Sequence, residues 1–108
     1  MNNIDLDSLN VFHNESKNRF EIQINSHKAV LAYSLQDKTI LFTHTGVPSA
    51  LEGQGIGSKL VKTGLEYARA NNLKVKSTCW FVSGYIERHP ESVQEQIHGN
   101  SISPGPAR

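Results

Sequence analysis

The sequence predicts an α+β fold built on a mixed, mostly antiparallel sheet, and two observations support this class. The first half of the chain alternates strand-like segments with short polar turns, which is typical of successive antiparallel strands. After a loop with three glycines, Gly53, Gly55 and Gly57, the apolar residues adopt helical spacing, and a further strand and a short helix follow.

Length and composition narrow the class of protein. The 108 residues suffice for one domain, which at this size buries roughly two-thirds of its unfolded surface. The formal net charge of +1 predicts no general attraction to nucleic acid or to an anionic membrane. The single cysteine excludes an intrachain disulfide and fits a reducing compartment. We therefore expect a cytoplasmic protein with neither nucleic acid nor membrane as a partner.

The ends of the chain differ from its middle in composition. Residues 1–10 are polar and acidic, without the basic start and apolar run of a secretory signal. Residues 99–108 are rich in Ser, Pro and Gly. We expect a flexible lead-in over residues 1–10, a domain over residues 11–98 and a disordered tail over residues 99–108. A monomer is the working expectation for the oligomeric state.

The stretch "VFHNESKNRFEIQI" predicts a hairpin with a turn at "NESKNR". Phe20, Ile22 and Ile24 alternate with polar residues, the period-2 pattern of a half-buried strand. After a turn at "NSH", the stretch "KAVLAYSLQ" predicts a more continuously apolar strand. A tight turn at Asp37 and Lys38 leads into the next one.

The stretch "TILFTHTGV" predicts a long strand rich in β-branched and aromatic residues. Strict alternation would put Ile40, Phe42 and His44 on one face of this strand and the intervening residues on the other. Pro48 ends the strand because it has no N–H to donate to a ladder.

A helix is predicted from Ile56 to the pair Asn71 and Asn72, whose residue type tolerates the left-handed backbone of a helix end. "LKVKSTCWFV" predicts the next strand, with Cys79 at its end and Trp80 and Phe81 packing on the sheet. "SGYIERHP" predicts a short helix beginning near Ser83, and "ESVQEQIHG" a further turn or helix.

The glycine loop does not fit two familiar phosphate-binding patterns. The dinucleotide pattern fails because Ser58 and Leu60 stand where glycines are needed, and the P-loop pattern fails because Lys59 is followed by leucine. Glycines before a helix N-terminus can nevertheless bring backbone amides close to an anion. The alternative is a tight turn without a ligand.

The stretch "VPSALEGQGIGSKLV" resembles the pyrophosphate loop of the GCN5-related N-acetyltransferase (GNAT) superfamily, whose pattern is Gln/Arg-x-x-Gly-x-Gly/Ala. Gly55 and Gly57 match the two glycines of this pattern, whereas Glu52 stands where the family has Gln or Arg. "HTGVPSALEGQGIGSKLV" followed by "STCWFVSGYIERHPE" resembles the small GNAT-like proteins in particular, over about residues 20–91. The resemblance implies a minimal GNAT-like fold, with a CoA-binding strand, glycine loop and helix and a short second helix.

The resemblance also implies a binding site for acetyl-CoA or coenzyme A between the fourth and fifth strands. The backbone around Thr45 and Val47 would pair with the pantetheine arm, and Arg88 would reach the CoA phosphates unless it only favours its helix end. Glu52 is expected to point away from the phosphates. The amides implied to hold the pyrophosphate are those of Gln54, Gly55, Ile56, Gly57 and Ser58.

Three side chains are implied as catalytic, each with a structural alternative. Cys79 would accept the acetyl group as a nucleophile, or would pack against the cofactor's sulfur. His44 would act as a general base toward an amine, or would be held within the sheet. Tyr85 would protonate the leaving thiolate, or would belong to the core.

The sequence thus predicts an acetyl-CoA-dependent N-acetyltransferase acting on an unidentified amine acceptor. The rival interpretation is a non-catalytic module that binds CoA or acetyl-CoA, and a third is an interaction domain without a ligand. The full-size superfamily carries additional helices and strands that this length does not accommodate, which leaves the acceptor open. No metal is expected, because metal-ligand spacing is absent among the histidines His13, His27, His44, His89 and His98.

Overall fold

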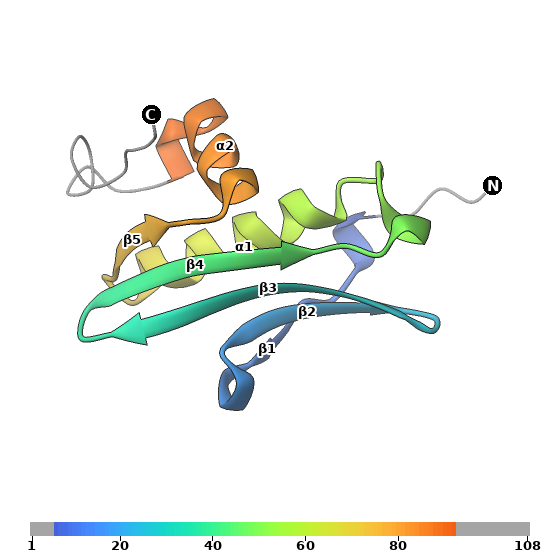
Figure 1. The fold of residues 1–108 in the computed structure, drawn as a ribbon, viewed down its shortest axis with the longest axis horizontal. Helices are drawn as coiled ribbons and strands as arrows, with labels where there is room; N and C mark the ends of the chain where they lie inside the picture. The colour runs from blue at the N-terminus through green and yellow to red at the C-terminus, as the bar shows by residue number, and fades with distance from the viewer. Residues whose placement is uncertain (1–5, 93–108) are drawn as a thin grey trace.

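The computed structural model describes residues 6–92, which form one five-stranded sheet with a long helix against one face (Figure 1). The strands lie in the order in which they occur in the chain. The regular elements are β1 (Phe12–Asn14), β2 (Arg19–Ile24), β3 (His27–Gln36), β4 (Thr39–Gly46), α1 (Ile56–Ala70), β5 (Lys74–Ser77) and α2 (Trp80–Arg88). Single 3-10 turns occupy Leu6–Ser8, Glu15–Lys17, Ser49–Leu51 and Pro90–Ser92.

The strand directions confirm the predicted α+β class with a mixed, mostly antiparallel sheet. The pairs β1–β2, β2–β3 and β3–β4 are antiparallel, whereas β4 and β5 are parallel and are joined through α1. The turns between the antiparallel strands contain Asn18, Asn25 and Asp37, all with positive φ. Asn and Asp adopt this backbone more readily than other non-glycine residues, which explains why the turns occur there.

The core lies between the sheet and α1. Phe20, Leu31 and Phe42 are fully buried on the sheet side, and Leu60 and Leu65 meet them from the helix. Burying each such side chain contributes roughly 1.5–3 kcal/mol to folding. The helix approaches closely at Gly64, where a Cβ atom would lie 3.0 Å from Leu31 Cδ2 and from Phe42 Cε1.

One polar residue of β2 departs from the predicted alternation. Glu21 is buried, although it lies on the sheet face opposite Phe20 and Ile22. Arg19 Nε lies 2.5 Å from its carboxylate, Asn14 Nδ2 donates a hydrogen bond of 3.1 Å, and Lys28 Nζ is 3.5 Å away. The hydrogen bond from Arg19 lowers the pKa of Glu21, so the buried carboxylate stays ionised and paired.

The strand predicted over "LKVKSTCWFV" is wrong in its second half. β5 ends at Ser77, and α2 begins at Trp80 rather than near Ser83. Ser77 Oγ accepts a hydrogen bond of 3.1 Å from the N–H of Cys79 and donates one of 2.9 Å to its carbonyl. This local bonding turns the chain out of the sheet. Trp80 therefore does not pack on the sheet and is 82% exposed.

The described region begins at Leu6 and ends at Ser92. At the N-terminal end, Leu6 and Leu9 pack against the core. Residues 1–5 and 93–108 lie outside the described residues, as do the predicted tail and most of the predicted segment "ESVQEQIHG". The predicted domain limits at residues 11 and 98 remain predictions.

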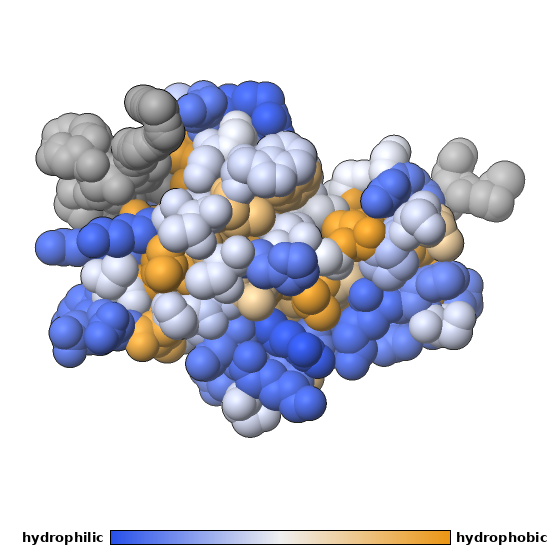
Figure 2. Space-filling view, in the orientation of Figure 1, coloured by the Kyte–Doolittle hydropathy of each residue, from blue (hydrophilic) through white to orange (hydrophobic). Residues whose placement is uncertain are grey.

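The surface facing the viewer in Figure 2 is mostly hydrophilic, with apolar residues scattered among polar ones. Within residues 6–92, no helix combines the length and the apolar character needed to cross a bilayer. The oligomeric state remains a prediction.

Candidate functional site

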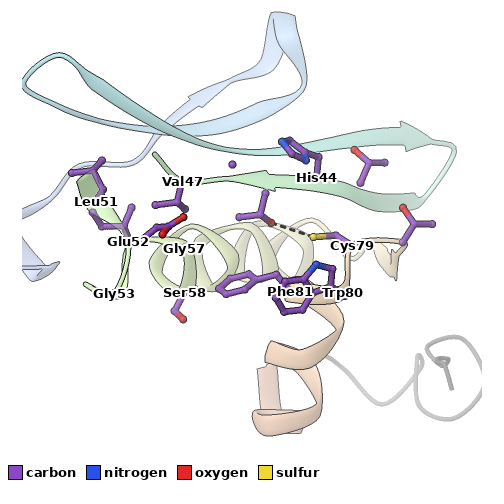
Figure 3. A pocket seen from close by; sticks show the side chains of 16 residues that line it. His44, Val47, Leu51, Glu52, Gly53, Gly57, Ser58, Cys79, Trp80 and Phe81 are labelled. Carbon is purple, nitrogen blue, oxygen red and sulfur yellow. Dashed lines mark hydrogen bonds between the residues drawn. The ribbon is translucent and has the colours of Figure 1, made fainter. Parts of the chain in front are cut away.

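A cleft of about 740 Å³ opens where the C-terminal part of β4 meets the beginnings of α1 and α2 (Figure 3). Its volume falls in the range of roughly 300–1,000 Å³ that is usual for ligand sites. Four stretches line the cleft: residues 43–47, 51–53, 55–58 and 78–81.

The cleft exists because two parallel strands separate. Pairing between β4 and β5 runs from Thr39 opposite Lys74 to Phe42 opposite Ser77. The N–H of Thr78 donates a last hydrogen bond, of 3.0 Å, to the carbonyl of Phe42. Because β4 continues to Gly46, its edge toward β5 has no strand partner beyond this point. An extended ligand can therefore pair with that edge as an additional strand would.

The glycine loop forms one end of the cleft. Gly53 and Gly55 have φ near +80°, a region that strains other residues. A Cβ atom on Gly55 would also lie 2.9 Å from Leu6 Cδ1, so this position excludes a side chain twice over. A Cβ atom on Gly57 would lie 3.0 Å from Phe81 Cζ. The loop thus brings its backbone to the cleft without side chains in the way.

The N-terminus of α1 supplies hydrogen-bond donors at this end. Gly55 is the N-cap and has no side chain to cap the helix, and the first bond of the helix runs from the N–H of Lys59 to Gly55 O, at 3.0 Å. The N–H groups of Ile56, Gly57 and Ser58 therefore have no acceptor within the helix. Free amides and the helix dipole together favour an anion at this place, so the residues present fit a pyrophosphate.

The cleft includes most, but not all, of the residues predicted to bind the cofactor. It is lined by Thr45, Val47, Gly55, Ile56, Gly57 and Ser58. Gln54 is not among the lining residues, and its Nε2 lies 3.4 Å from the carbonyl oxygen of Ala50. Arg88 also lies away from the cleft, in the last turn of α2. Glu52 lines the cleft at the glycine-loop end, and its orientation relative to a phosphate remains a prediction.

Cys79 lies at the opposite end of the cleft, as the N-cap of α2. Its Sγ is 3.4 Å from Thr45 Oγ1, a contact that joins β4 to the start of α2 (Figure 3). Its backbone is fixed on both sides by Ser77, which in turn accepts a hydrogen bond of 3.1 Å from Ser83 Oγ. The thiol is therefore held at a defined position while remaining partly accessible.

His44 does not share a face with Phe42, and the prediction by alternation is wrong here. The register pairs Ala32 with His44 but Tyr33 with Phe42, which leaves Thr43 as an extra residue in β4. This β-bulge reverses the alternation beyond it. His44 consequently lies on the face of Ala32, on the other side of β4 from Cys79 (Figure 3). Both side chains still line the cleft, because it lies beyond the last β4–β5 pair.

Tyr85 is not among the cleft-lining residues. It is buried within α2, where its ring centroid lies 4.4 Å from that of His89. Burial raises the pKa of its phenol. The cleft therefore brings together two of the three predicted catalytic side chains, Cys79 and His44.

Sequence reasoning missed three side chains at the cleft. The Thr45 hydroxyl was not predicted to contact Cys79, and Trp80 and Phe81 were assigned to the sheet. A signal for Phe81 was present, since Phe81 and Tyr85, like Val82 and Ile86, are four residues apart, which is helical spacing. Among residues 6–92, no three His, Cys, Asp or Glu side chains gather as a metal site would require; the absence of a metal remains a prediction.

Comparison with known proteins agrees with this geometry. The sequence model of the family described as GCN5-related N-acetyl-transferase matches residues 19–96. The chain is 34% identical to Protein NATD1 of Danio rerio over 95 residues, which cover 83% of this chain and 86% of that protein. It is 33% identical to Protein NATD1 of Homo sapiens over 85 residues, which cover 76% and 75% of the two chains.

A solved structure shows the same fold. The solution structure of a GCN5-like protein from Staphylococcus aureus superimposes with a TM-score of 0.60 at 30% sequence identity. The match covers 93% of this chain and 99% of that one. The chain belongs to the GCN5-related N-acetyltransferase family, which confirms the resemblance found in its sequence.

Proposed function

We propose that this member of the GCN5-related N-acetyltransferase family binds acetyl-CoA in the cleft and transfers the acetyl group to an amine. One observation carries the proposal: the unpaired edge of β4 leads from the glycine loop and uncapped N-terminus of α1, at one end of the cleft, to a thiol and an imidazole at the other. Acetyl-CoA is an elongated anionic thioester, and it would meet these features in this order, from its pyrophosphate to its acetyl group.

At the glycine-loop end, the proposed contacts come from the backbone. The amides of Ile56, Gly57 and Ser58 hold the pyrophosphate, and the helix dipole adds favourable charge. Along the cleft, the free edge of β4 from Thr43 to Val47 pairs with the extended arm. When bound, acetyl-CoA supplies the acetyl group as an activated thioester.

At the opposite end, His44 takes the proton that the amine must lose in order to attack. This histidine is exposed at the cleft rather than enclosed in the core. In the net reaction a carbon–nitrogen bond forms, the carbon–sulfur bond breaks, and the thiolate that leaves takes up a proton. Tyr85 has no part in this step, because it lies off the cleft.

Two routes for the acetyl group fit the position of Cys79. In the direct route the amine attacks the donor, and Cys79 with Thr45 forms the wall beside the reacting sulfur. In the two-step route, Cys79 Sγ would lose its proton and bond to the acetyl carbon while the donor carbon–sulfur bond breaks and the CoA sulfur takes up a proton. The amine would then attack the acetyl-cysteine, and the thiol of Cys79 would form again.

The second candidate is a non-catalytic module that binds CoA or acetyl-CoA. The burial of Tyr85 away from the cleft favours it, because one predicted proton donor is then missing from the site. Both candidates need the glycine-loop end of the cleft, and only the enzyme needs His44 and an acceptor.

Calorimetric titration of the full chain with CoA and with acetyl-CoA tests both candidates. We expect heat of binding from both ligands, followed by release of free CoA thiol when amines are added. Intact-mass analysis after acetyl-CoA treatment of the wild-type protein and Cys79→Ala decides the route, since an acetyl group found only on the wild type supports acetyl-cysteine. No heat from either ligand would contradict both candidates, and heat without turnover or adduct would favour the binding module.

A further inference from the structure

The indole of Trp80 is largely exposed at the cleft. Trp80 is 82% exposed, although it is the first residue of α2 and lines the cleft beside Cys79. Two other large apolar side chains in the described region are exposed, Phe12 at 61% and Leu35 at 43%, and neither lines the cleft. Single exposed apolar residues are common on protein surfaces. An exposed indole that also lines a cleft, however, requires an explanation.

The neighbours of Trp80 fix the direction in which it points. Phe81 packs toward α1, with its Cζ 3.0 Å from the place of a Cβ on Gly57, and Val82 is fully buried. On the other side, the backbone of Cys79 is bonded to Ser77. The Trp80 and Phe81 rings meet edge to face, with centroids 6.1 Å apart. The indole is therefore presented to solvent by a rigid segment.

Trp80 lies toward the Cys79 end of the cleft, opposite the glycine loop. Glu52 and Gly53 occupy one end, and Trp80 and Cys79 lie toward the other, with Phe81 between them and Ser58 (Figure 3). A donor held by its pyrophosphate at the glycine loop extends toward Cys79. The acceptor amine must meet the thioester there, next to the indole.

The charges around the cleft narrow the class of acceptor. The single carboxylate among the lining residues belongs to Glu52, at the far end from Trp80. The lining residues that adjoin Trp80 in the chain are Thr78, Cys79 and Phe81, and none of them carries a carboxylate. A polyamine or another acceptor with a second cation would find no counter-ion beside these residues. A flat apolar group would find an aromatic surface.

We propose that Trp80 is an acceptor-binding residue and that the acceptor is a primary amine joined through a short linker to an aromatic ring. The ring stacks on the exposed indole, and the linker lets the amine nitrogen reach the thioester beside Cys79. This inference rests on the proposed function, since it assigns the acceptor of the same cleft.

The chain contains one tryptophan, so its indole N–H gives a single reporter signal in a ¹H–¹⁵N spectrum. We titrate the full chain with phenethylamine, with 2-cyclohexylethylamine as the non-aromatic match, and with spermidine as the polycation, each with and without saturating CoA. We expect phenethylamine to shift the indole signal at concentrations about tenfold lower than the other two amines, because aromatic stacking adds to apolar burial. Equal responses to the three amines, or no response, would overturn the inference.

Turnover of the Trp80→Ala and Trp80→Phe variants supplies the second test. We expect Trp80→Ala to lower kcat/KM for phenethylamine about tenfold, mostly through KM, with Trp80→Phe recovering most of it. The Kd for CoA should stay within about twofold. Phe12→Ala is the matched control, since it removes an exposed aromatic ring outside the cleft.

The two proposals fail in different ways. A large loss of CoA affinity in Trp80→Ala, with unchanged selectivity among amines, would show that the indole contacts the donor and would overturn the inference alone. If the wild type does not bind CoA, the proposed function is contradicted. The indole titration without CoA would still measure the preference for aromatic amines.

Discussion

The two ends of the cleft recognise chemistry in different ways. At the glycine-loop end, the main binding groups are backbone amides at the uncapped start of α1, where Gly55 and Gly57 carry no side chains, and Glu52 also lines this end. At the Cys79 end, the available groups are side chains, held by a β-bulge, a strand end and a helix start. The first end therefore suits an anion, whereas at the second end the side chains determine what can bind.

This contrast explains which parts of the site could be predicted from the sequence. Glycine spacing before a helix directly reports a backbone requirement, so the loop with Gly55 and Gly57 can be located from the sequence, whereas its contact with a pyrophosphate remains a prediction. The fold class followed equally well from periodicity and from turn residues such as Asn25 and Asp37. These signals come from residues close together in the chain, so they can be detected in a single sequence.

The Cys79 end depends on features that periodicity cannot report. The extra residue Thr43 reverses the face of His44, and nothing in "LFTHTG" distinguishes a bulge from a regular strand. The early start of α2 depends on Ser77 bonding to the backbone of Cys79. Aromatic residues such as Trp80 favour strands, so propensity alone extended β5 too far.

The largest effect is expected from closing the glycine-loop end. Gly57→Val would place a branched side chain where even a Cβ would lie 3.0 Å from Phe81 Cζ and 3.5 Å from Val47 Cγ2, beside the first amides of α1. We expect CoA affinity to fall by about a hundredfold or more, measured by calorimetry, because charge-assisted amide contacts are lost.

Gly84→Ala is the matched control for this change, since it modifies a helical glycine whose Cβ would meet only Arg88 Nη1, at 3.4 Å. CoA affinity of Gly84→Ala should equal that of the wild type. Retained affinity in a folded Gly57→Val variant would contradict the assignment of the pyrophosphate to this loop.

The next largest effect is expected from a substitution of His44, which should lower turnover without weakening CoA binding. His44→Gln removes the proposed base while preserving a polar side chain on the exposed side of β4. We expect kcat to fall by about a hundredfold, in line with general base catalysis, and CoA affinity to remain within about twofold. Steady-state turnover and calorimetry on the same preparation make this comparison. A parallel loss of CoA affinity would mean that His44 contacts the donor instead.

A smaller effect is expected at the contact between the two sides of the cleft. Thr45→Val keeps the shape of the side chain but removes the hydroxyl that lies 3.4 Å from Cys79 Sγ. We expect a fall of about three- to tenfold in kcat, since one modest hydrogen bond of about 0.5–1.5 kcal/mol is lost. Thr43→Val is the matched control, because Thr43 Oγ1 instead donates a 3.4 Å bond to the carbonyl of Ala32. Equal rates in the two variants would show that the Thr45 hydroxyl does not orient the thiol.

The smallest effect is expected from His13, which lies outside the cleft. Measuring it separates a loss of activity in acid from a loss of folded protein. His13 stacks on Phe20 with ring centroids 4.1 Å apart, and its Nε2 lies 2.6 Å from Tyr33 Oη. Burial lowers the pKa of His13 below its ordinary value of 6.5. The unfolded chain therefore takes up a proton at a higher pH than the folded chain does. This stabilising contribution is complete above pH 6.5 and is lost as the pH falls from there through the folded pKa.

We accordingly expect Tm to decrease modestly between pH 7 and pH 5, and His13→Gln, which still reaches Tyr33 but does not titrate in this range, to flatten that slope. The lowered pKa of Glu21 acts only below its ordinary value of 4.5, so it does not interfere in this window. Thermal unfolding of the two proteins at both pH values gives the comparison. If turnover by His13→Gln still falls in acid while its Tm stays constant, the loss of activity does not come from unfolding of the scaffold. An undiminished Tm slope in His13→Gln would show that some other group governs the stability of the scaffold in this range.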